Sequence, residues 1–385
     1  METNVEKPSL SLTIITSEDR MRELREEWAA LSARCATAHF SQSAVWAERA
    51  WRLVAKPRGR ALACFVVRAD RRLVGIWPTV TFADRGLMVL RPLGYEGSEY
   101  SLPLIEDGLA DTGESARLMW NAVRKVADLV LLPQIRIDSG FARTVRAASI
   151  LTAAYWLAAA PFMERMRFRD WNQYQETVPS SLRYEIRRAK RRLAELGNFT
   201  LERQGDGDCA AAIDWMIAQK RKQLSETGKF NDWIESTEYR NFLVAMADVP
   251  DSPEGGIAIF AARIDGVVIA AHLVSFDRAR VEGFLVAYDK SWRDFSPGNV
   301  LGEHVLQWAF ERGLDFDFRP GDDVYKSKWA TAALPTATWL VAPGWRGLPR
   351  VGARCLTLGI QRLRMRIALG SRLQKLLQAA GLRAK

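Results

Sequence analysis

The chain has 385 residues, of which 48% are hydrophobic and 26% are charged. This balance is typical of a soluble globular protein, and it excludes disordered, collagen-like and disulfide-scaffold chains. At about 150 residues per domain, the length predicts two or three domains. The four cysteines lie far apart and include no C-x-x-C pair, so the sequence predicts neither a zinc knuckle nor a disulfide framework.

The positive charge is concentrated at one end of the chain. The net charge is +10, from 55 basic and 45 acidic residues, and residues 343–385 hold ten basic residues and no acidic one. The rest of the chain is therefore neutral, which argues against a nucleic-acid footprint over the whole protein. The N-terminal residues are too acidic for a secretory signal, and no uncharged stretch reaches the about 18 apolar residues of a membrane-spanning helix. We expect a cytoplasmic protein.

The first third of the chain mixes helices and strands. Helical spacing of apolar residues and two apolar runs joined by a short polar segment predict a helix and a hairpin. The expected elements are the strand Leu10–Ile15, a helix from Glu18 to about Arg34, the hairpin strands Ala61–Arg68 and Leu73–Val80, the helix Ser115–Ala127 and the strand Leu129–Ile137.

The second half repeats this pattern at larger scale. Asp265-Gly266 between two apolar runs predicts a tight hairpin. The expected helices are Ser180–Leu196, Cys209–Thr227, Thr237–Ala247 and Gly298–Arg312, and the expected strands are Gly256–Ile264, Val267–Phe276, Arg280–Tyr288, Asp315–Arg319 and Thr338–Val341.

This order of elements resembles the acyl-CoA N-acyltransferase (GNAT) fold. The local sequence resembles more closely the CelD/BioF2-like acetyltransferases of that family, which are often associated with bacterial polysaccharide biosynthesis. Three sequence pieces carry the resemblance: Tyr288-Asp289 followed by Ser296-Pro297-Gly298, a helix with Trp308-Ala309, and Asp317-Phe318-x-x-Gly321-Asp322 leading to Tyr325-Lys326-x-x-Trp329. The resemblance covers about residues 10–342 and extends, more distantly, to the Fem-type aminoacyl transferases.

The resemblance implies a mixed α/β fold with tandem GNAT-like domains. We expect an N-terminal domain at residues 1–145 on the acceptor side, an acyl-CoA domain at 146–342 and a basic amphipathic helical tail at 343–385. The implied function is that of an N-acyltransferase, with acetyl-CoA or another acyl-CoA as co-substrate and no metal. Its acceptor would be an amine on a small molecule or glycan, such as an amino sugar of a polysaccharide.

The donor-binding residues are expected at the start of one helix. Ser296, Pro297, Gly298 and Asn299 follow a strand and a loop, and backbone N–H groups at a helix N-terminus favour a pyrophosphate. Arg293 adds positive charge to the same segment. The alternative is an ordinary helix start with Ser296 as the N-cap.

Five residues are candidates for catalysis. By resemblance to the Fem-type enzymes, Lys326 would polarise the acyl carbonyl or hold a phosphate, and Tyr325 would protonate the departing thiolate. Glu282 lies on the strand where GNAT enzymes often place a base, Asp317 lies between two phenylalanines, and His272 follows two alanines on a central strand. The alternatives are a solvated Glu282, an Asp317 paired with a buried arginine, a structural His272, a core Tyr325 and a solvated Lys326.

Other functions and sites stay open at this stage. One alternative is an aminoacyl-tRNA-dependent Fem-type transferase, the only case in which we expect a nucleic-acid partner. Another is a non-catalytic GNAT-like scaffold of a polysaccharide machine. The segment Tyr95–Tyr100 is an acceptor-site candidate, and the basic helix Arg183–Arg192 is either a solvated face or an anion cradle. The tail, being basic, acid-free and amphipathic, either packs on the body or binds an anionic inner membrane surface.

Overall fold

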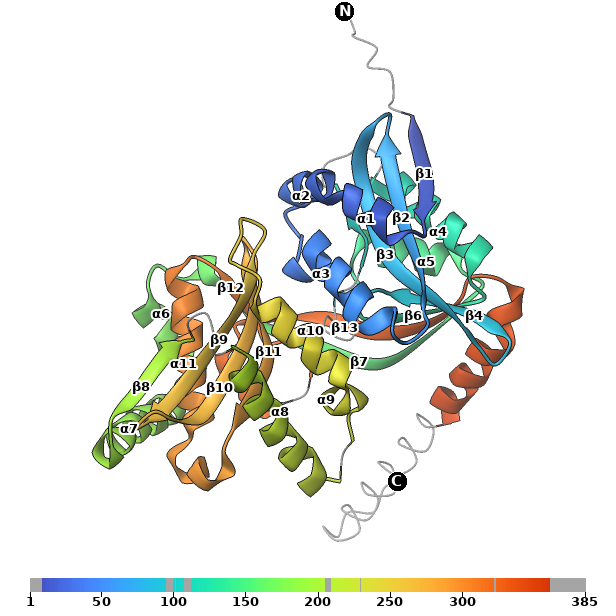
Figure 1. Ribbon diagram of the computed structural model, residues 1–385. Coiled ribbons are helices and arrows are strands. Elements are labelled where there is room, and N and C mark those ends of the chain that lie inside the picture. The colour runs from blue at the N-terminus through green and yellow to red at the C-terminus, as the bar shows by residue number, and fades with distance from the viewer. Residues whose placement is uncertain are drawn as a thin grey trace, which may run out of the picture.

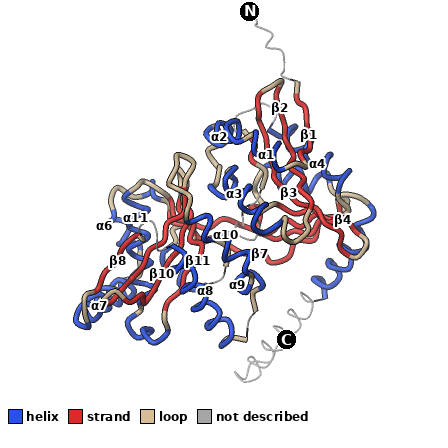
Figure 2. Tube along the Cα trace, viewed as in Figure 1, coloured by secondary structure: helices blue, strands red, loops and turns tan. Residues whose placement is uncertain are grey.

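The computed structural model describes residues 9–94, 100, 102–106, 112–204, 209–228, 230–321 and 323–360. Its strands form one mixed sheet of 13 strands with helices on both faces, which confirms the expected α/β class (Figures 1 and 2). The strand order along the sheet is β1-β2-β3-β4-β6-β13-β7-β12-β11-β10-β9-β8, with β5 paired to β3.

The N-terminal half contains the first part of this sheet and its helices. Its strands are β1 (Leu10–Ile15), β2 (Ala61–Ala69), β3 (Arg72–Asp84), β4 (Leu87–Pro92), β5 (Leu104–Ile105) and β6 (Leu129–Arg136). Its helices are α1 (Glu18–Glu23), α2 (Arg25–Ala33), the 3-10 helix η1 (Phe40–Gln42), α3 (Ala44–Ala50), the π-helix η2 (Trp51–Ala55), α4 (Thr112–Val126) and α5 (Gly140–Ala148).

The C-terminal half contains the remaining elements. Its strands are β7 (Leu151–Met163), β8 (Phe199–Arg203), β9 (Gly256–Ile264), β10 (Val267–Phe276), β11 (Arg280–Tyr288), β12 (Asp315–Asp317) and β13 (Ala332–Ala342). Its helices are η3 (Arg165–Arg167), α6 (Trp171–Thr177), α7 (Ser180–Leu196), α8 (Cys209–Glu226), α9 (Asp232–Glu235), α10 (Thr237–Ala247), η4 (Lys290–Phe295), α11 (Pro297–Glu311), α12 (Val324–Trp329) and η5 (Trp345–Gly347).

Strand β13 joins the two halves. It pairs antiparallel with β6 of the N-terminal half and, along its whole length, with β7. The last strand of the chain therefore lies in the middle of the sheet, and β7 and β13 run between the halves (Figure 1). Ladder hydrogen bonds continue across this junction, so the two halves share one sheet.

The helices cover both faces of the sheet and form three main cores. Helices α4 and α5 pack on one face of the N-terminal strands, and α7 and α11 pack on one face of β9–β12. On the opposite face, α1–α3 and α8–α10 contribute to a single core that spans both halves. Within it the ring of Trp46 lies 5.1 Å from that of Phe242 and 5.7 Å from that of Phe284, measured between centroids.

After β13 and η5 the chain forms a packed helix over residues 348–360. Val351 on this helix is fully buried, and Leu348, Cys355 and Leu358 pack beside it against residues of β4, β6 and β7. The first part of the expected basic tail is therefore attached to the body, and residues 361–385 lie outside the described residues. Within the described ranges, no helix is long and apolar enough to cross a membrane.

Candidate active site

Two neighbouring parallel strands separate in the C-terminal half. β11 pairs with β12 at only three positions, the last being Glu282 opposite Asp317. β12 ends there, whereas β11 continues to Tyr288. We call the point where the two strands separate, at Glu282 and Asp317, the vertex. Beyond it lies a cavity of about 600 Å³, which is lined by residues 283–286 of β11 on one side and by residues 316 and 318–320 on the other. Among the described residues, this edge of β11 has no strand partner beyond Glu282, so it faces the cavity unpaired.

A β-bulge shapes β11 where it enters the cavity. Leu273 of β10 pairs with Leu285 and Val274 pairs with Gly283, so Phe284 is the extra residue. Phe284 lines the cavity and contacts Trp46 of the N-terminal half. The guanidinium of Arg319 lies 4.6 Å from the centroid of the Phe284 ring. The bulge is therefore held between the N-terminal half and the end of β12.

The expected donor-binding residues all line this cavity. Arg293 comes from η4, and Ser296, Pro297, Gly298 and Asn299 come from the start of α11. Pro297 occupies the first turn of α11, where its missing N–H removes no helical hydrogen bond. The start of a 15-residue helix therefore lies at the cavity wall.

Ser296 occupies the N-cap position of α11, but its side chain does not cap the helix. Its φ of 46° is left-handed, and its side chain makes no capping hydrogen bond. Instead its Oγ donates to Oε1 of Glu185 on α7 over 2.5 Å, and Asn299 Nδ2 donates to the same oxygen over 3.2 Å. A carboxylate therefore lies beside the N-terminus of α11, where the helix dipole stabilises negative charge.

Positive charge predominates in the cavity lining. Among the described lining residues, Lys220, Arg293, Arg319 and Lys326 are cationic, and Asp323 is the only carboxylate. Lys220 comes from α8 and donates to Gln223 Oε1 over 3.1 Å. Burial, with a further contribution from Lys326, lowers the pKa of Lys220. A ligand with several negative charges would relieve the repulsion among these cations.

Lys326 holds the loop that follows β12. It is 6% exposed, and its Nζ donates to the carbonyl oxygens of Arg319 and Pro320 over 3.1 and 3.2 Å. The same atom lies 3.5 Å from Oδ2 of Asp323. An ammonium group has three N–H donors, and three oxygen atoms surround this one. The neighbouring Tyr325 is 43% exposed on the cavity wall, and burial of its hydroxyl together with Asp323 raises its pKa to about 12.

His272 lines the cavity from β10. It is 7% exposed, and its Nδ1 has no hydrogen-bond partner among the described residues. A Cβ added at Gly283 would come within 3.3 Å of His272 Nε2, so the ring lies close to the β11 backbone. Burial, reinforced by Lys220, lowers the pKa of His272 to about 3. The imidazole is therefore neutral at physiological pH, and its buried Nδ1 is unpaired among the described residues.

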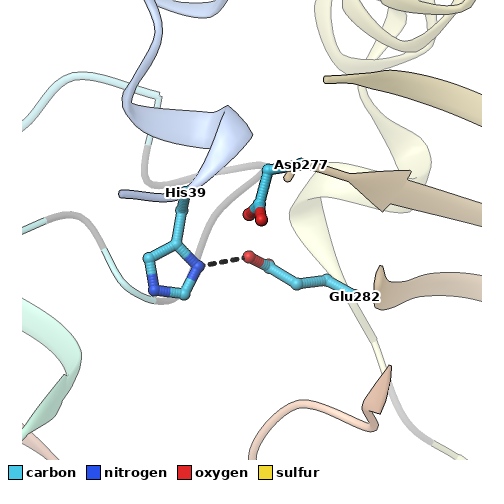
Figure 3. Close-up of side chains that lie close together, drawn as sticks. All are labelled: His39, Asp277 and Glu282. Carbon is cyan, nitrogen blue, oxygen red and sulfur yellow. Dashed lines mark hydrogen bonds and ion pairs between the residues drawn. The ribbon is translucent and has the colours of Figure 1, made fainter. Parts of the chain in front are cut away.

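Glu282 is buried at the vertex and paired with the N-terminal half. Its Oε1 lies 2.5 Å from Nδ1 of His39, which precedes η1 (Figure 3). Burial alone would raise the pKa of Glu282, but His39, Arg319 and Arg280 together lower it. Glu282 is 2% exposed, so the alternative of a solvated edge residue is wrong. The carboxyl group is ionised at neutral pH.

Asp317 has the opposite electrostatic environment. Its Oδ1 accepts hydrogen bonds from the hydroxyl of Tyr100 over 3.2 Å and from the backbone N–H of Arg319 over 2.6 Å. Burial and the neighbouring Glu282 carboxylate raise its pKa to about 6. Two adjacent carboxyl groups with pKa values shifted in opposite directions are typical of acid–base sites.

One group of side chains has the composition of a metal site. One ring nitrogen of His39 and one carboxylate oxygen each of Asp277 and Glu282 lie within 4.8 Å of one another (Figure 3). However, Nη1 of Arg280 lies 3.3 Å from His39 Nε2, and a guanidinium only donates. Nε2 is therefore the acceptor and Nδ1 carries the proton toward Glu282. Because a metal ligand needs a free lone pair, this tautomer does not fit a cation at Nδ1.

The structure adds residues that the sequence did not single out. His39 and Lys220 were not assigned to the site, and Tyr100 appeared only within a broader acceptor candidate whose residues 95–99 lie outside the described ranges. His39 and Glu282 are 243 positions apart, and Tyr100 and Asp317 are 217 apart. No local spacing signals such pairs. The acidic and aromatic character of the segment before Tyr100 was the only sequence signal.

Comparisons with known proteins identify the domain that holds this cavity. Residues 180–327 match the family model described as an acetyltransferase (GNAT) domain. The chain therefore contains a GNAT domain that extends from α7 into α12. No curated protein matches the sequence.

Solved structures extend the likeness over most of the chain. The structure of FemX is 12% identical, covers 85% of this chain and 96% of its own, and superposes with a TM-score of 0.58. A conserved protein of unknown function from Bacteroides thetaiotaomicron is 11% identical, with 86% and 100% covered and a TM-score of 0.53. The C-terminal domain of a putative lysylphosphatidylglycerol synthetase from Agrobacterium fabrum is 12% identical, with 88% and 95% covered and a TM-score of 0.51. The GNAT resemblance is thus confirmed, and the shared feature at these identities is the fold.

Proposed function

We propose that the chain is an N-acyltransferase that moves an acyl group from acyl-CoA to an amine. The observation that carries the proposal is the cavity between the separated strands β11 and β12, with the N-terminus of α11 and four cationic side chains in its wall. A phosphorylated donor suits this charge, and a pantetheine arm suits the unpaired edge of β11. The GNAT family match covers the same elements.

The proposed reaction needs no further reactant. The nitrogen of a neutral amine attacks the thioester carbon, an amide bond forms and the carbon–sulfur bond breaks. One proton leaves the nitrogen and one reaches the departing sulfur. A base must accept the first proton, and donors must stabilise the oxyanion that develops on the carbonyl oxygen.

We assign these roles to the residues around the vertex. Glu282, ionised beside His39, is the candidate base. The backbone at the Phe284 bulge is the candidate oxyanion donor, because a bulge residue is left unpaired in the ladder. Tyr325, whose pKa of about 12 keeps it protonated, is the candidate proton donor to the thiolate. Lys326 positions residues 319 and 320, and the neutral His272 offers a hydrogen bond to the donor.

The donor site is tested by two substitutions at one position. A Cβ at Gly298 would lie 3.5 Å from Tyr288 Cδ1, an ordinary contact, so Gly298→Ala fits. Gly298→Glu adds a negative charge beside the proposed pyrophosphate and should weaken CoA binding at least about tenfold, because like charges repel. Calorimetry with CoA, acetyl-CoA and longer acyl-CoAs measures both variants. Equal CoA affinity in Gly298→Glu and Gly298→Ala would refute the proposal, and turnover with charged tRNA instead would favour a Fem-type transferase.

We further propose acetyl-CoA as the donor and an amino sugar of a polysaccharide as the acceptor. The resemblance of residues 281–329 to the CelD/BioF2-like acetyltransferases supports this choice. Steady-state release of CoA in the presence of amino sugars tests it. A strong preference for a longer acyl-CoA, or for amines unrelated to sugars, would contradict it.

We also propose that the C-terminal end binds an anionic membrane surface on the cytoplasmic side. The outer face of helix 348–360 presents exposed apolar residues, of which Leu356 is 71% and Ile360 51% exposed. The exposed Arg346 and Arg350 lie close by in sequence, and residues 361–385 add seven basic residues and no acidic one. Apolar and cationic groups together are typical of interfacial helices.

A further inference from the structure

A second cavity lies in the N-terminal half. Its volume is also about 600 Å³, and it is lined by the segment before η1, the region of β5, helix α4, the end of β6 and the start of α5. Apolar residues, among them Leu102, Leu104 and Phe141, form much of its wall, together with hydroxyl and amide side chains. A cavity with an apolar wall and a few convergent polar groups is the usual form of a small-molecule site.

This second cavity reaches the vertex of the first site. His39 and Tyr100 line it, and the same two side chains hold Glu282 and Asp317. Their rings lie 5.2 Å apart between centroids. The neighbours of the two carboxylates along their strands, Gly283 and Phe316, line the first cavity instead. The carboxyl groups therefore lie between the two cavities.

The charges in the second cavity are positive. Arg136 and Arg143 line it, and no carboxylate does among the described lining residues. Both arginines are held in place by one acidic residue. Arg136 forms two hydrogen bonds to the Asp138 carboxylate, over 3.1 and 2.8 Å, and Arg143 Nη1 donates to the Asp138 carbonyl oxygen over 2.6 Å. Arg143 remains exposed at the surface.

We propose that the second cavity binds the acceptor, and that the acceptor is an amine whose molecule also carries an anionic group, a phosphate or a carboxylate. The buried carboxyl groups beyond His39 and Tyr100 attract the ammonium end, and Arg136 and Arg143 bind the anionic end. This inference rests on the proposed function, since it assigns the second substrate of the same reaction. It predicts separate binding of donor and acceptor on the two sides of Glu282 and Asp317.

Two probe amines that differ only in a phosphate test the charge preference. Calorimetry compares D-glucosamine with D-glucosamine 6-phosphate, and we expect the phosphate to improve affinity about tenfold or more, as for hydrogen bonds to charged groups. Arg143→Gln should remove most of this preference. The inference would be overturned if the protein bound the two amines with equal affinity, or if it did not bind D-glucosamine 6-phosphate. It would also be overturned if Arg143→Gln kept the full preference for D-glucosamine 6-phosphate.

A steric variant locates the binding site. Thr144→Trp places a large side chain in the cavity from α5, whereas Ala147→Trp places it on the exposed face of the same helix. We expect Thr144→Trp to abolish binding of glucosamine 6-phosphate and Ala147→Trp to retain it. Both variants should bind CoA as the parent protein does, which shows that they are folded. If Thr144→Trp still bound glucosamine 6-phosphate, the inference would be overturned.

These measurements separate the inference from the proposed function. If glucosamine 6-phosphate binds as described but no acyl transfer from acetyl-CoA occurs, the acyl-transfer proposal fails and the anion-selective amine site stands. If CoA is released in the presence of amines, but Thr144→Trp and Ala147→Trp have equal kcat/KM for glucosamine 6-phosphate, the acyltransferase stands and its acceptor binds elsewhere.

Discussion

Glu282 and Asp317 lie opposite each other at the last paired position of two parallel strands, where β11 and β12 separate. Each carboxyl group is buried, and each is held by a different side chain of the N-terminal half, His39 for Glu282 and Tyr100 for Asp317. Because two adjacent buried anions repel, the pair is most stable with one proton, which Asp317 holds below about pH 6. The proposed reaction centre therefore needs both halves of the chain.

The first prediction concerns the pH dependence of stability. The pKa of Asp317 rises from 3.8 to about 6 on folding, so the folded protein binds a proton more tightly than the unfolded chain. This contribution favours the folded state at low pH and is lost as the pH rises from about 4 to about 6. Asp317→Asn has no such proton to lose and keeps an oxygen that accepts from Tyr100. We expect it to be more stable than the parent at pH 7.5 by about 1–3 kcal/mol.

Urea unfolding at pH 4.5 and pH 7.5 measures this difference. The advantage of Asp317→Asn should shrink at the lower pH, because the parent protein then keeps its proton. The exposed Asp294→Asn serves as the control and should show no comparable pH dependence. An advantage of Asp317→Asn that is equal at both pH values would contradict the assigned titration.

The second prediction concerns Lys326. Its ammonium donates to two carbonyl oxygens in the wall of the donor cavity, so Lys326→Ala leaves buried acceptors without a donor. Such a loss typically costs about 1–3 kcal/mol. We expect a lower free energy of unfolding together with weaker CoA binding, because residues 319 and 320 line the cavity. Urea unfolding and calorimetry measure the two effects.

Lys328→Ala, on the exposed side of the same helix, is the matched control and should change neither quantity. A different result is expected if Lys326 instead has the catalytic role that the resemblance suggests. If Lys326→Ala keeps its stability and its CoA affinity but loses turnover by about 10²–10³, the ammonium acts on the transition state.

Much of the fold follows from local patterns in the sequence. The strand Gly256–Ile264 and the helices Ser180–Leu196 and Thr237–Ala247 have the predicted bounds. The strand is an apolar run that ends at the turn Asp265-Gly266, and the two helices have apolar residues at helical spacing. The sequence does not predict strand β7. Its sequence, an uncharged run interrupted by Pro161, shows no alternation, since parts of both faces are covered. The sequence also does not predict α12 within its polar segment, because a helix of six residues leaves almost no periodic signal.

In the candidate site, too, the sequence predicts local groups of residues but not contacts between distant segments. The residues expected to bind the donor around Gly298 come from one continuous segment, so a local motif is enough to group them on one cavity wall. The partners of Glu282 and Asp317 come from the other half of the chain. Only the central position of β13, which joins β6 to β7, brings the two halves into one sheet. No spacing in the sequence encodes that juxtaposition, and His39 alone gives no indication of a partner.

The third prediction concerns Glu185. Its carboxylate accepts hydrogen bonds from Ser296 and Asn299 at the start of α11, close to the proposed pyrophosphate. Glu185→Gln keeps an oxygen acceptor and removes the negative charge. We therefore expect CoA to bind more tightly, by about two- to tenfold at low ionic strength. Because Glu185 is exposed, this gain should decrease at high salt, where the Debye length falls to about 3 Å.

Calorimetry with CoA at low and high salt measures both effects. Glu195→Gln removes an equal charge from the exposed surface of the same helix and is the control. A weaker affinity in Glu185→Gln would show that Glu185 supports the donor site rather than opposing the donor.

The last prediction concerns the C-terminal end. Val351 and its neighbours attach helix 348–360 to the body, so a chain that ends at Ala342 would lose a packed helix. A chain that ends at Ile360 keeps this helix and removes seven basic residues. Each Lys or Arg near an anionic lipid surface contributes about 1 kcal/mol. We expect the full-length protein to sediment with vesicles of phosphatidylcholine and phosphatidylglycerol at low salt, and the shortened chain to bind them much more weakly.

The apolar contribution is tested without a change of charge. Leu356→Ser with Ile360→Ser removes the two exposed apolar side chains and should reduce sedimentation at low salt, whereas the exposed Thr357→Ser should not. Pure phosphatidylcholine vesicles should bind little of any variant, because the cationic residues then have no anionic partner, and high salt should release the full-length protein. If the full-length protein fails to bind the anionic vesicles at low salt, or binds both lipid compositions equally, the end of the chain has no role at an anionic membrane surface.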